Sequence, residues 1–342
     1  MTLPPLRFEP ILRNRAWGGD RLANWGRVLP ATGGIGESWD LADLPPTIAG
    51  GISRIAEGPL EGRSLADLRA ERSGELLGRL SPASTGGFPL LVKLLDAEDD
   101  LSVQVHPDPS YAAEHPEAFV KNEAWFVLEA RPGAAVYRGI KDDVTPELFL
   151  EALREGRLLE CLVRIEVRPG DCVRLPSGIC HALGAGVLVI EAQTPSDTTF
   201  RVWDWDRNDP ARPLHLEAAL ECMRFGERQH DGRPAVISLD QATPVSHDGI
   251  TTRRLCSTDD FTIDHVELAD RRLEITTDDE PTVLTGVSGT AQVLDAEGRS
   301  TRLAAGDTVL IPASCPRPEV RSDSSASILQ INLPLVSPRT LA

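Results

Sequence analysis

The chain has 342 residues, 41% of them hydrophobic, and a formal net charge of −17. The length favours about two domains of roughly 150 residues, and the acidic charge argues against nucleic acid and an anionic membrane surface as partners. No apolar run approaches the ~18 residues of a membrane span and no signal peptide follows Met1, so we expect a cytoplasmic protein.

The segment before residue 100 predicts one helix and one buried strand. Leucines recur at helical spacing between residues 64 and 80, with Ser64 as a candidate N-cap and a break near residues 73–74. Residues 88–95 are nearly all apolar except for Lys93. A buried strand must provide such an ammonium group with a partner or an anion, unless the side chain reaches the rim of the sheet.

Polar side chains alternate with valines in the next segment, LSVQVHPD at residues 101–108. A strand has a period of two, so Ser102, Gln104 and His106 share one face. After an insert, Glu123 precedes a second strand-like run at residues 124–128. A hydroxyl, an amide and an imidazole in a row indicate a functional face, because a core face would carry apolar residues.

A turn that carries a histidine follows in PGDCVRLPSGICHAL at residues 169–183. Gly170, Pro176, Gly178 and His181 give the pattern G-x5-P-x-G-x2-H. The pattern predicts a strand, a tight turn and a second strand with the histidine.

Together these segments supply two imidazoles, one carboxylate and one amide oxygen. This set suits a borderline divalent ion, with zinc as the first candidate and iron, manganese or cobalt as alternatives. Each residue alone has an ordinary explanation, because a histidine beside a proline is more often a capped surface or core residue. The metal hypothesis therefore depends on the combination of Gln104, His106, Glu123 and His181.

The rest of the chain predicts further helices and a change of texture near residue 232. Helices are expected at residues 111–118, 145–156 and 213–225, and strands at residues 158–167 and 187–190. Beyond residue 232, short strand-like runs separated by turn residues predict an all-β domain. These runs are 235–239, 261–268, 272–276, 282–287, 291–294, 308–311 and 327–331.

One motif occurs twice. PGDCVRLPSG at residues 169–178 and AGDTVLIPAS at residues 305–314 share the pattern G-D-x-V-x-x-P followed by a small residue. They predict two copies of one β-barrel unit. The second copy has Arg317 in place of His181, so we expect it to be structural.

Cysteine and lysine usage add two constraints. The six cysteines form no C-x-x-C pair, which argues against zinc-knuckle and redox motifs and favours reduced, buried thiols. Lysine occurs only at Lys93, Lys121 and Lys141, while arginine carries the other positive charges. Lysine is a compact charge with an adjustable pKa, so Lys93 and Lys121 near the polar segments indicate a task that arginine would not perform.

The turn around residues 170–181 resembles the second motif of the cupin superfamily. The wide separation of Gln104 and His106 from Glu123 is similar to that in the type I phosphomannose isomerases, and the chain resembles the short bacterial form of that family along much of its length. The matching stretches are AWGG (16–19), GESW (36–39), PLLVKLLDA (89–97), LSVQVHPD (101–108), KNEAW (121–125), LPSGICHALG (175–184) and EAQTPSDTTFRVWDWDR (191–207).

This resemblance, with the repeat, implies a mainly β fold of two cupin-type antiparallel β-barrel (jelly-roll) domains with a few accessory helices. We expect a catalytic metal-binding domain at residues 1–231, with helical insertions at about 64–80, 145–156 and 213–225. A degenerate domain without metal ligands is expected at residues 232–342. The resemblance implies an isomerase with one Zn²⁺ per chain that interconverts mannose 6-phosphate and fructose 6-phosphate through an enediol. We expect a monomer or a weak homodimer.

The resemblance also implies roles for individual residues. Gln104, His106, Glu123 and His181 match the zinc ligands, and Arg201 matches the catalytic arginine. Positions that line the sugar-phosphate pocket are matched by Ser102, Lys93, Lys121 and Arg207.

Several alternatives stay open at this stage. Glu191 and Lys121 are both candidates for the general base. Without the family match, Arg201 and Arg207 would be interpreted as surface partners of Asp204 and Asp206. Other functions compatible with the sequence are an isomerase of a related or unphosphorylated sugar, an oxidative iron cupin, and a non-catalytic sugar-binding cupin.

Overall fold

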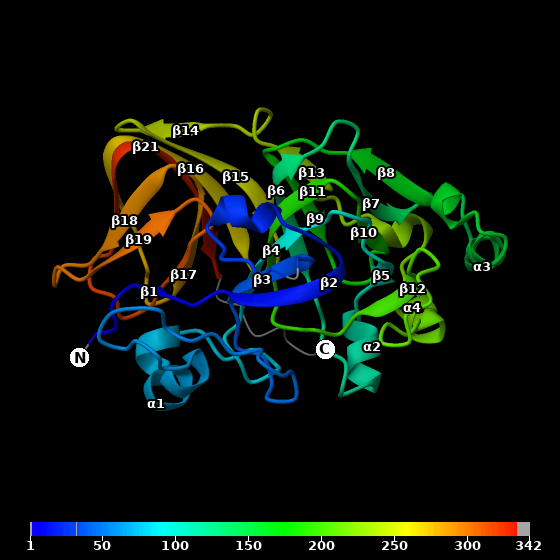
Figure 1. Cartoon of the computed structure of the whole chain (residues 1–342), viewed down its shortest axis with the longest axis horizontal. Coiled ribbons are helices and arrows are strands. Elements are labelled where there is room, and N and C mark those ends of the chain that lie inside the picture. Colours follow the sequence, from blue (N-terminus) through cyan, green and yellow to red (C-terminus); the bar gives the residue numbers. More distant parts are fainter. Residues whose placement is uncertain (1, 32, 334–342) are drawn as a thin grey trace.

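Antiparallel strands dominate the computed structural model of the chain, which describes residues 2–31 and 33–333 (Figure 1). The strands form three sheets, and short helices lie around them. Residues 245–332 occupy the left half of Figure 1, and most of residues 91–238 occupy the right half. The predicted mainly β fold with a few accessory helices is confirmed.

A seven-stranded sheet forms the middle of the molecule. Its central strands are apolar on both sides, as is typical of strands that are covered on both faces. In order across the sheet, the strands are β13 (Val236–Ser238), β9 (Asp171–Leu175), β6 (Glu123–Ala130), β11 (Val187–Gln193), β4 (Leu91–Asp96), β3 (Ile35–Leu41) and β2 (Ile11–Gly19).

A five-stranded sheet faces one side of this central sheet. Trp125 and Val127 of β6 pack in one apolar cluster with Leu183 of the smaller sheet. In order, its strands are β12 (Phe200–Trp203), β5 (Val103–Val105), β10 (His181–Leu183), β7 (Ala135–Ile140) and β8 (Leu162–Glu166).

A nine-stranded sheet packs against the other side of the central sheet. Phe126, which points the opposite way from Trp125, shares a core cluster with Val283 and Leu329 of this sheet. Its main path is β1 (Leu6–Arg7), β20 (Thr308–Ile311), β17 (Thr282–Ser288), β21 (Glu319–Asn332), β16 (Thr262–Glu274), β15 (Ile250–Ser257) and β14 (Val245–His247), while β18 (Thr290–Leu294) and β19 (Ser300–Ala304) branch from β21.

The helices lie close to where the sequence predicts them. Ser64 caps α1 (Leu65–Leu77) by accepting a hydrogen bond from the Asp67 amide, and the expected break falls at Arg72, whose backbone is not helical. The others are α2 (Pro109–Glu114), α3 (Pro146–Arg154) and α4 (Leu216–Cys222), with 3₁₀ turns η1 (Arg21–Trp25), η2 (Leu158–Cys161) and η3 (Gly226–Gln229). Within the described ranges, none of the helices combines the length and the apolarity needed to cross a bilayer.

Some predicted boundaries are wrong. The strand expected at residues 158–167 begins with the η2 turn, whose Leu158 and Cys161 pack under α3 instead of joining the sheet. The runs at residues 261–268 and 272–276 form one strand, β16, because pairing with β21 continues past a bulge near Asp270. The runs expected beyond residue 232 also do not include strands β14, β15 and β19.

The two copies of the repeated motif adopt the same turn. Gly170 and Gly306 both have positive φ, a conformation that glycine adopts at little cost. The following aspartates each accept a hydrogen bond from the amide three residues earlier, Asp171 from Arg168 and Asp307 from Ala304, both at 2.9 Å. A strand follows each turn, β9 in one sheet and β20 in another.

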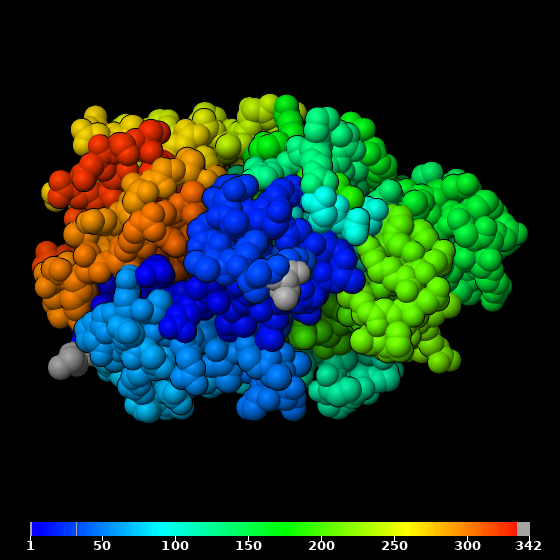
Figure 2. Space-filling view, in the orientation of Figure 1, coloured from blue at the N-terminus to red at the C-terminus, as the bar shows by residue number. Residues whose placement is uncertain are grey.

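The predicted domain boundary near residue 231 stays a proposal. Three elements pack or pair with elements from the other side of this boundary. Strand β1 pairs with β20, and β13 pairs with β9. Helix α1, expected as an insertion in the first domain, shares a core cluster with the nine-stranded sheet. Figure 2 shows the N-terminal segment in blue covering the middle of this face, between the orange C-terminal strands and the green segments.

A buried ion pair holds the central sheet against the second copy of the turn. The Arg27 guanidinium donates to Asp40 at 2.6 Å and to the Gly306 carbonyl at 2.7 Å. Both charged side chains are almost completely buried, at 3% and 4% exposure. Removal of one partner would leave the other charge buried and uncompensated.

We predict that Arg27→Ala lowers the free energy of unfolding by about 3–5 kcal/mol, because Asp40 loses its counter-charge in a buried position. Chemical denaturation of the variant and the parent measures the difference. The control is Arg63→Ala, which removes an ion pair with the exposed Glu71 and should cost about 0–1 kcal/mol. Equal losses in the two variants would contradict the prediction.

Candidate active site and metal centre

Three strands of the five-stranded sheet place site residues side by side. Gln104 in β5 lies directly opposite His181 in β10 and opposite Arg201 in β12. Directly opposed residues in an antiparallel sheet point to the same face. The register therefore lines up an imidazole, an amide and a guanidinium on the face that looks toward the central sheet.

The central sheet contributes a second set of polar side chains. Glu123 in β6 lies opposite Gln193 in β11, and Glu191 in β11 lies opposite both Lys93 in β4 and Trp125 in β6. Glu123, Glu191 and Lys93 are all buried. Two facing sheets thus bring together residues that are as much as about 100 positions apart in the chain.

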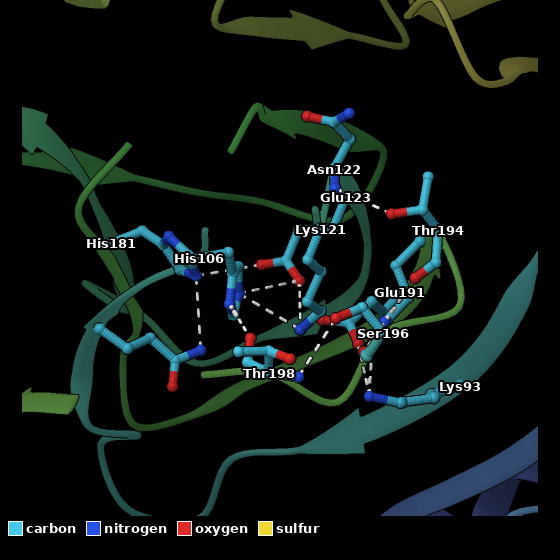
Figure 3. Close-up of polar contacts among 12 residues, drawn as sticks. Lys93, His106, Lys121, Asn122, Glu123, His181, Glu191, Thr194, Ser196 and Thr198 are labelled. Carbon is cyan, nitrogen blue, oxygen red and sulfur yellow. Dashed lines mark hydrogen bonds and ion pairs between the residues drawn. The ribbon is translucent and has the colours of Figure 1, made fainter. Parts of the chain in front are cut away.

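Three of the four predicted metal ligands converge between these sheets (Figure 3). The ligand atoms of His106, Glu123 and His181 all lie within 4.8 Å of one another. His106 Nε2 is 3.4 Å from Glu123 Oε2, and His181 Nε2 is 3.0 Å from Glu123 Oε1. All three side chains are at most 1% exposed.

Hydrogen bonds to backbone carbonyls set which ring nitrogen carries the proton. His106 Nδ1 lies 3.0 Å from the Thr198 oxygen, and His181 Nδ1 lies 2.8 Å from the Ile179 oxygen. A carbonyl oxygen can only accept, so each Nδ1 donates and each Nε2 presents its lone pair to Glu123. Such backbone contacts orient metal-binding histidines in proteins.

This arrangement fits a cation. Two lone pairs and a carboxylate face one another, and neither Glu123 oxygen accepts a well-formed hydrogen bond although both are buried. Lys121 Nζ lies 2.7 Å from Oε2 but does not have hydrogen-bond geometry. A positive charge between His106, Glu123 and His181 would satisfy all three groups, so the cluster could hold a metal ion.

Gln104 lies against the same cluster. Its Nε2 is 3.4 Å from His181 Nε2, and its Oε1 accepts a hydrogen bond from Ser102 Oγ at 3.2 Å. A half-turn of the amide exchanges its nitrogen and oxygen and would present Oε1 to the cluster.

Burial and neighbouring charges set the protonation states of the cluster. Burial lowers the pKa of His106 to about 3, and the Lys121 ammonium adds to this effect, so the imidazole is neutral. Burial alone would raise the pKa of Glu123, but Lys121 holds it well below its usual range. Burial would also lower the pKa of Lys121, yet the carboxylates of Glu123 and Glu191 raise it.

Lys93 and Glu191 form a second buried network beside the cluster. Lys93 Nζ lies 3.1 Å from Glu191 Oε1 and donates to Gln193 Oε1 at 2.7 Å. Trp125 Nε1 donates to Glu191 Oε2 at 2.8 Å. The neighbouring strand β11 thus gives the buried Lys93 ammonium a carboxylate partner, as the sequence requires.

A polar cavity of about 520 Å³ opens onto both networks. Five of the side chains that line it are basic: Arg15, Lys93, Lys121, Arg201 and Arg212. Acidic side chains line it as well, among them Glu37 and Glu191. The cavity also includes Ser102 and Gln104 in its walls.

Arg201 differs from the other basic side chains of the cavity. Within the described ranges, the other four each form an ion pair, whereas Arg201 forms none and its buried Nε has no hydrogen-bond partner. Burial and the neighbouring Arg212 lower the pKa of Arg201. The guanidinium is therefore placed to gain from an anionic or polar ligand in the cavity.

Arg207 does not line the cavity, whereas Ser102, Lys93 and Lys121, the other residues predicted to line the sugar-phosphate pocket, do. Its guanidinium contacts Asp204 at 3.2 Å and donates to the Asp100 carbonyl at 2.7 Å. Arg212 also binds Asp204, at 2.7 and 3.0 Å, and lines the cavity. The contact with Asp204 matches the alternative interpretation for Arg207, and its role in substrate binding stays a prediction.

Sequence reasoning missed several residues of the cavity wall. Arg15 Nε donates to Glu37 Oε1 at 2.7 Å, and Trp39 Nε1 donates to Glu37 Oε2 at 2.5 Å. Arg15 directly precedes the AWGG stretch and Glu37 lies within GESW, so those matching stretches carried the signal. Asp197 and Arg212 also line the cavity and fall in segments without a strand or helix pattern.

An antiparallel β fold with a His–Glu–His cluster beside a polar cavity is the arrangement of a metal-site cupin. A family model, "Phosphomannose isomerase type I, catalytic domain", matches residues 6–125. Mannose-6-phosphate isomerase ManA of Bacillus subtilis (strain 168) is 38% identical over 225 residues, which cover 65% of this chain and 68% of that protein. The chain belongs to the type I phosphomannose isomerase family.

Further relatives cover more of the chain. The putative mannose-6-phosphate isomerase YvyI of Bacillus subtilis is 31% identical over 321 residues, which cover 92% of this chain and 95% of that protein. The crystal structure of the mannose 6-phosphate isomerase from Bacillus subtilis aligns with a TM-score of 0.82 at 28% identity, covering 96% of this chain and 100% of that chain. The likeness therefore extends beyond the region that the family model matches.

We predict that Glu37 contributes stability that acid removes. Burial alone would raise the pKa of Glu37, but Lys93 and Arg15 lower it to about 2. A lowered pKa stabilises the fold above the ordinary value of about 4.5, and this contribution is lost as the pH falls toward 2. The shift corresponds to at most about 3 kcal/mol.

The test compares the unfolding free energies of the parent and Glu37→Gln between pH 6 and pH 3. The stability gap between the two proteins should narrow as the pH falls, because below about pH 4.5 Glu37 binds a proton in the unfolded parent but not in the folded parent, and glutamine binds none in either state. Glu61→Gln, at an exposed position, serves as the control and should follow the parent. A gap that is constant across this range would contradict the prediction.

Proposed function

We propose that this chain is a metal-dependent aldose–ketose isomerase that interconverts mannose 6-phosphate and fructose 6-phosphate. The observation that carries the proposal is the His106–Glu123–His181 cluster beside a cavity that also holds Glu191 and the guanidinium of Arg201, which forms no ion pair among the described residues. The names of the relatives supply the substrate, and a cavity of about 520 Å³ is large enough for a hexose phosphate.

Gln104, His106, Glu123 and His181 would hold one divalent ion per chain. Neutral imidazoles with a carboxylate and an amide oxygen favour zinc, with iron, manganese and cobalt as the alternatives. When bound, the ion supplies a Lewis acid that stabilises negative charge on an oxygen atom.

The isomerisation moves a proton from C2 of the aldose to C1 through an enediol. A base must accept that proton and return it, and we assign this role to Glu191. Its carboxylate lines the cavity, and contacts with Lys93 and Trp125 fix its orientation. Lys121, the other candidate, lies between Glu123 and His106 and would balance charge within the ligand set.

Charge that develops on the substrate oxygens requires a positively charged or hydrogen-bonding partner. Arg201 is suited to this role, because its guanidinium is partly buried in the cavity and has no carboxylate partner in the described chain. Charge stabilisation of this kind is stronger in a site of low dielectric constant than in water.

The phosphate group would bind to cationic and hydroxyl side chains of the cavity wall. Ser102 and Lys93, which are predicted to line the sugar-phosphate pocket, line the cavity, and we assign them as phosphate ligands. We assign the arginine contact to Arg212, which lines the cavity while Asp204 holds its guanidinium by two hydrogen bonds. Arg207 would act indirectly, because it donates to Oδ1 of the same carboxylate, an oxygen that also accepts a hydrogen bond from Arg212.

A coupled assay with mannose 6-phosphate tests the function. We predict that turnover falls to background after chelation, because the ligand set loses its cation, and that Zn²⁺ restores it. Parallel additions of Fe²⁺, Mn²⁺ and Co²⁺ identify the preferred metal, and unphosphorylated mannose tests the phosphate preference. Oxygen uptake with iron would favour an oxidative cupin, and binding of mannose 6-phosphate without turnover in the zinc-loaded protein would overturn the proposal.

Single substitutions should separate the residues that hold the metal from those that carry the chemistry. We predict that His181→Ala abolishes zinc retention. Arg201→Ala and Glu191→Gln should retain zinc but lower kcat by roughly 10²-fold or more. Metal analysis and steady-state kinetics on the same samples measure both quantities, and Arg164→Ala, at an exposed ion pair on strand β8, is the control. An active His181→Ala protein without metal would contradict the assignment.

A further inference from the structure

Asn122 separates two site residues but points away from them. Lys121 and Glu123 face the ligand cluster, whereas the Asn122 amide, just before strand β6, points away from the cluster (Figure 3). That amide makes two hydrogen bonds. Its Oδ1 accepts from the Ser177 backbone amide at 2.9 Å, and its Nδ2 donates to Asp260 Oδ2 at 2.7 Å.

The Ser177 bond connects Asn122 to the turn before His181. The next residue, Gly178, has a positive φ and donates its amide to the His106 carbonyl at 3.0 Å. The following carbonyl, that of Ile179, accepts from His181 Nδ1. A shift of this turn would therefore move both histidine ligands relative to Glu123.

The backbone of Asn122 connects it to a third segment of the site. Its amide donates to Thr194 Oγ1 at 3.0 Å, and its carbonyl accepts from the Thr194 amide at 2.9 Å. The same loop supplies the Thr198 carbonyl that orients His106. Asn122 thus contacts both segments whose backbone carbonyls accept from the two imidazoles.

Asp260 belongs to the nine-stranded sheet, in the turn between β15 and β16. Thr258 Oγ1 accepts from the amides of Asp260 and Phe261 at 3.1 and 2.9 Å. Phe261 is fully buried in the core cluster shared with the central sheet. The position of Asp260 is therefore fixed by the core of the nine-stranded sheet, whose described residues contribute no side chain to the cavity beside the metal cluster.

We propose that Asn122 and Asp260 are positioning residues, through which the nine-stranded sheet holds Glu123 and the His181 turn in the geometry that binds the metal. The proposal builds on the proposed metal-dependent function. It gives the C-terminal part of the chain a role in the reaction without contact to the substrate. Residues that orient metal ligands typically change metal affinity or activity by about 10- to 100-fold when they are replaced.

Exchange of the two side chains gives a sharp test. In Asn122→Asp, two carboxylates meet at the 2.7 Å contact, so zinc affinity should fall about 10- to 100-fold. Asp260→Asn keeps a carbonyl acceptor for the Asn122 amide and should have a smaller effect. The double variant Asn122→Asp/Asp260→Asn restores a donor and an acceptor at the original net charge, and zinc affinity should return to within a few-fold of the parent.

Zinc affinity is measured by competition with a chromophoric chelator, and kcat and KM for mannose 6-phosphate are measured on zinc-saturated samples. The control is Asp259→Asn on the same turn, which removes an exposed ion pair with Arg233 and should leave both quantities unchanged. Asp260→Ala provides a second test if Asn122→Asp does not fold, and it should weaken zinc binding without loss of the folded state.

The outcomes separate the two proposals. A double variant as impaired as Asn122→Asp, or an Asp260→Ala protein with parental zinc affinity, would overturn the positioning role. Recovery of zinc affinity in the double variant, in a protein without isomerase activity, would retain the positioning role and overturn the proposed function instead. Loss of kcat together with zinc affinity in Asn122→Asp, and recovery of both in the double variant, supports both proposals.

Discussion

The buried Glu123 carboxylate is the constraint on which the rest of the site depends. A fully buried anion is costly unless positive charge or hydrogen bonds compensate it. Here the nearest groups are two imidazole nitrogens, whose protons are directed elsewhere, and one ammonium group. The ammonium alone leaves the two histidine lone pairs facing a carboxylate, and a divalent cation would compensate all of these groups together.

The stacked sheets explain how such a site can be rigid. The ligands come from both facing sheets, and the central sheet is packed on its other side by the nine-stranded sheet. Few strands near the site are therefore free to shift independently. The second copy of the G-D turn retains the backbone geometry of the first, but Arg317 stands where the first copy has His181. It preserves the packing role of the unit without its ligands.

Most of the basic side chains that line the cavity are also paired with carboxylates. Lys93, Lys121, Arg15 and Arg212 each pair with a carboxylate, so these acidic side chains add little net negative charge to the cavity. Arg201 remains as the unpaired guanidinium among the described residues of the cavity wall. Arg201 could therefore bind a phosphate group or a developing oxyanion, although the net negative charge of the whole protein repels anions.

The sequence by itself determined the features that depend on local periodicity and turn chemistry. The strand period of two predicts that Ser102, Gln104 and His106 share one face, and the G-x5-P-x-G-x2-H pattern predicts the turn before His181. Ser64 is the predicted N-cap of α1 and caps this helix in the structure. Tertiary structure decided that Arg212 lines the cavity and Arg207 does not. Trp205, Asp206 and Asn208 have left-handed backbone conformations, and the turn that they form brings Arg207 back to Asp204. It also decided the contact between Asn122 and Asp260, since the two residues are 138 positions apart and no local pattern can encode which turn of one sheet lies against the start of a strand in another.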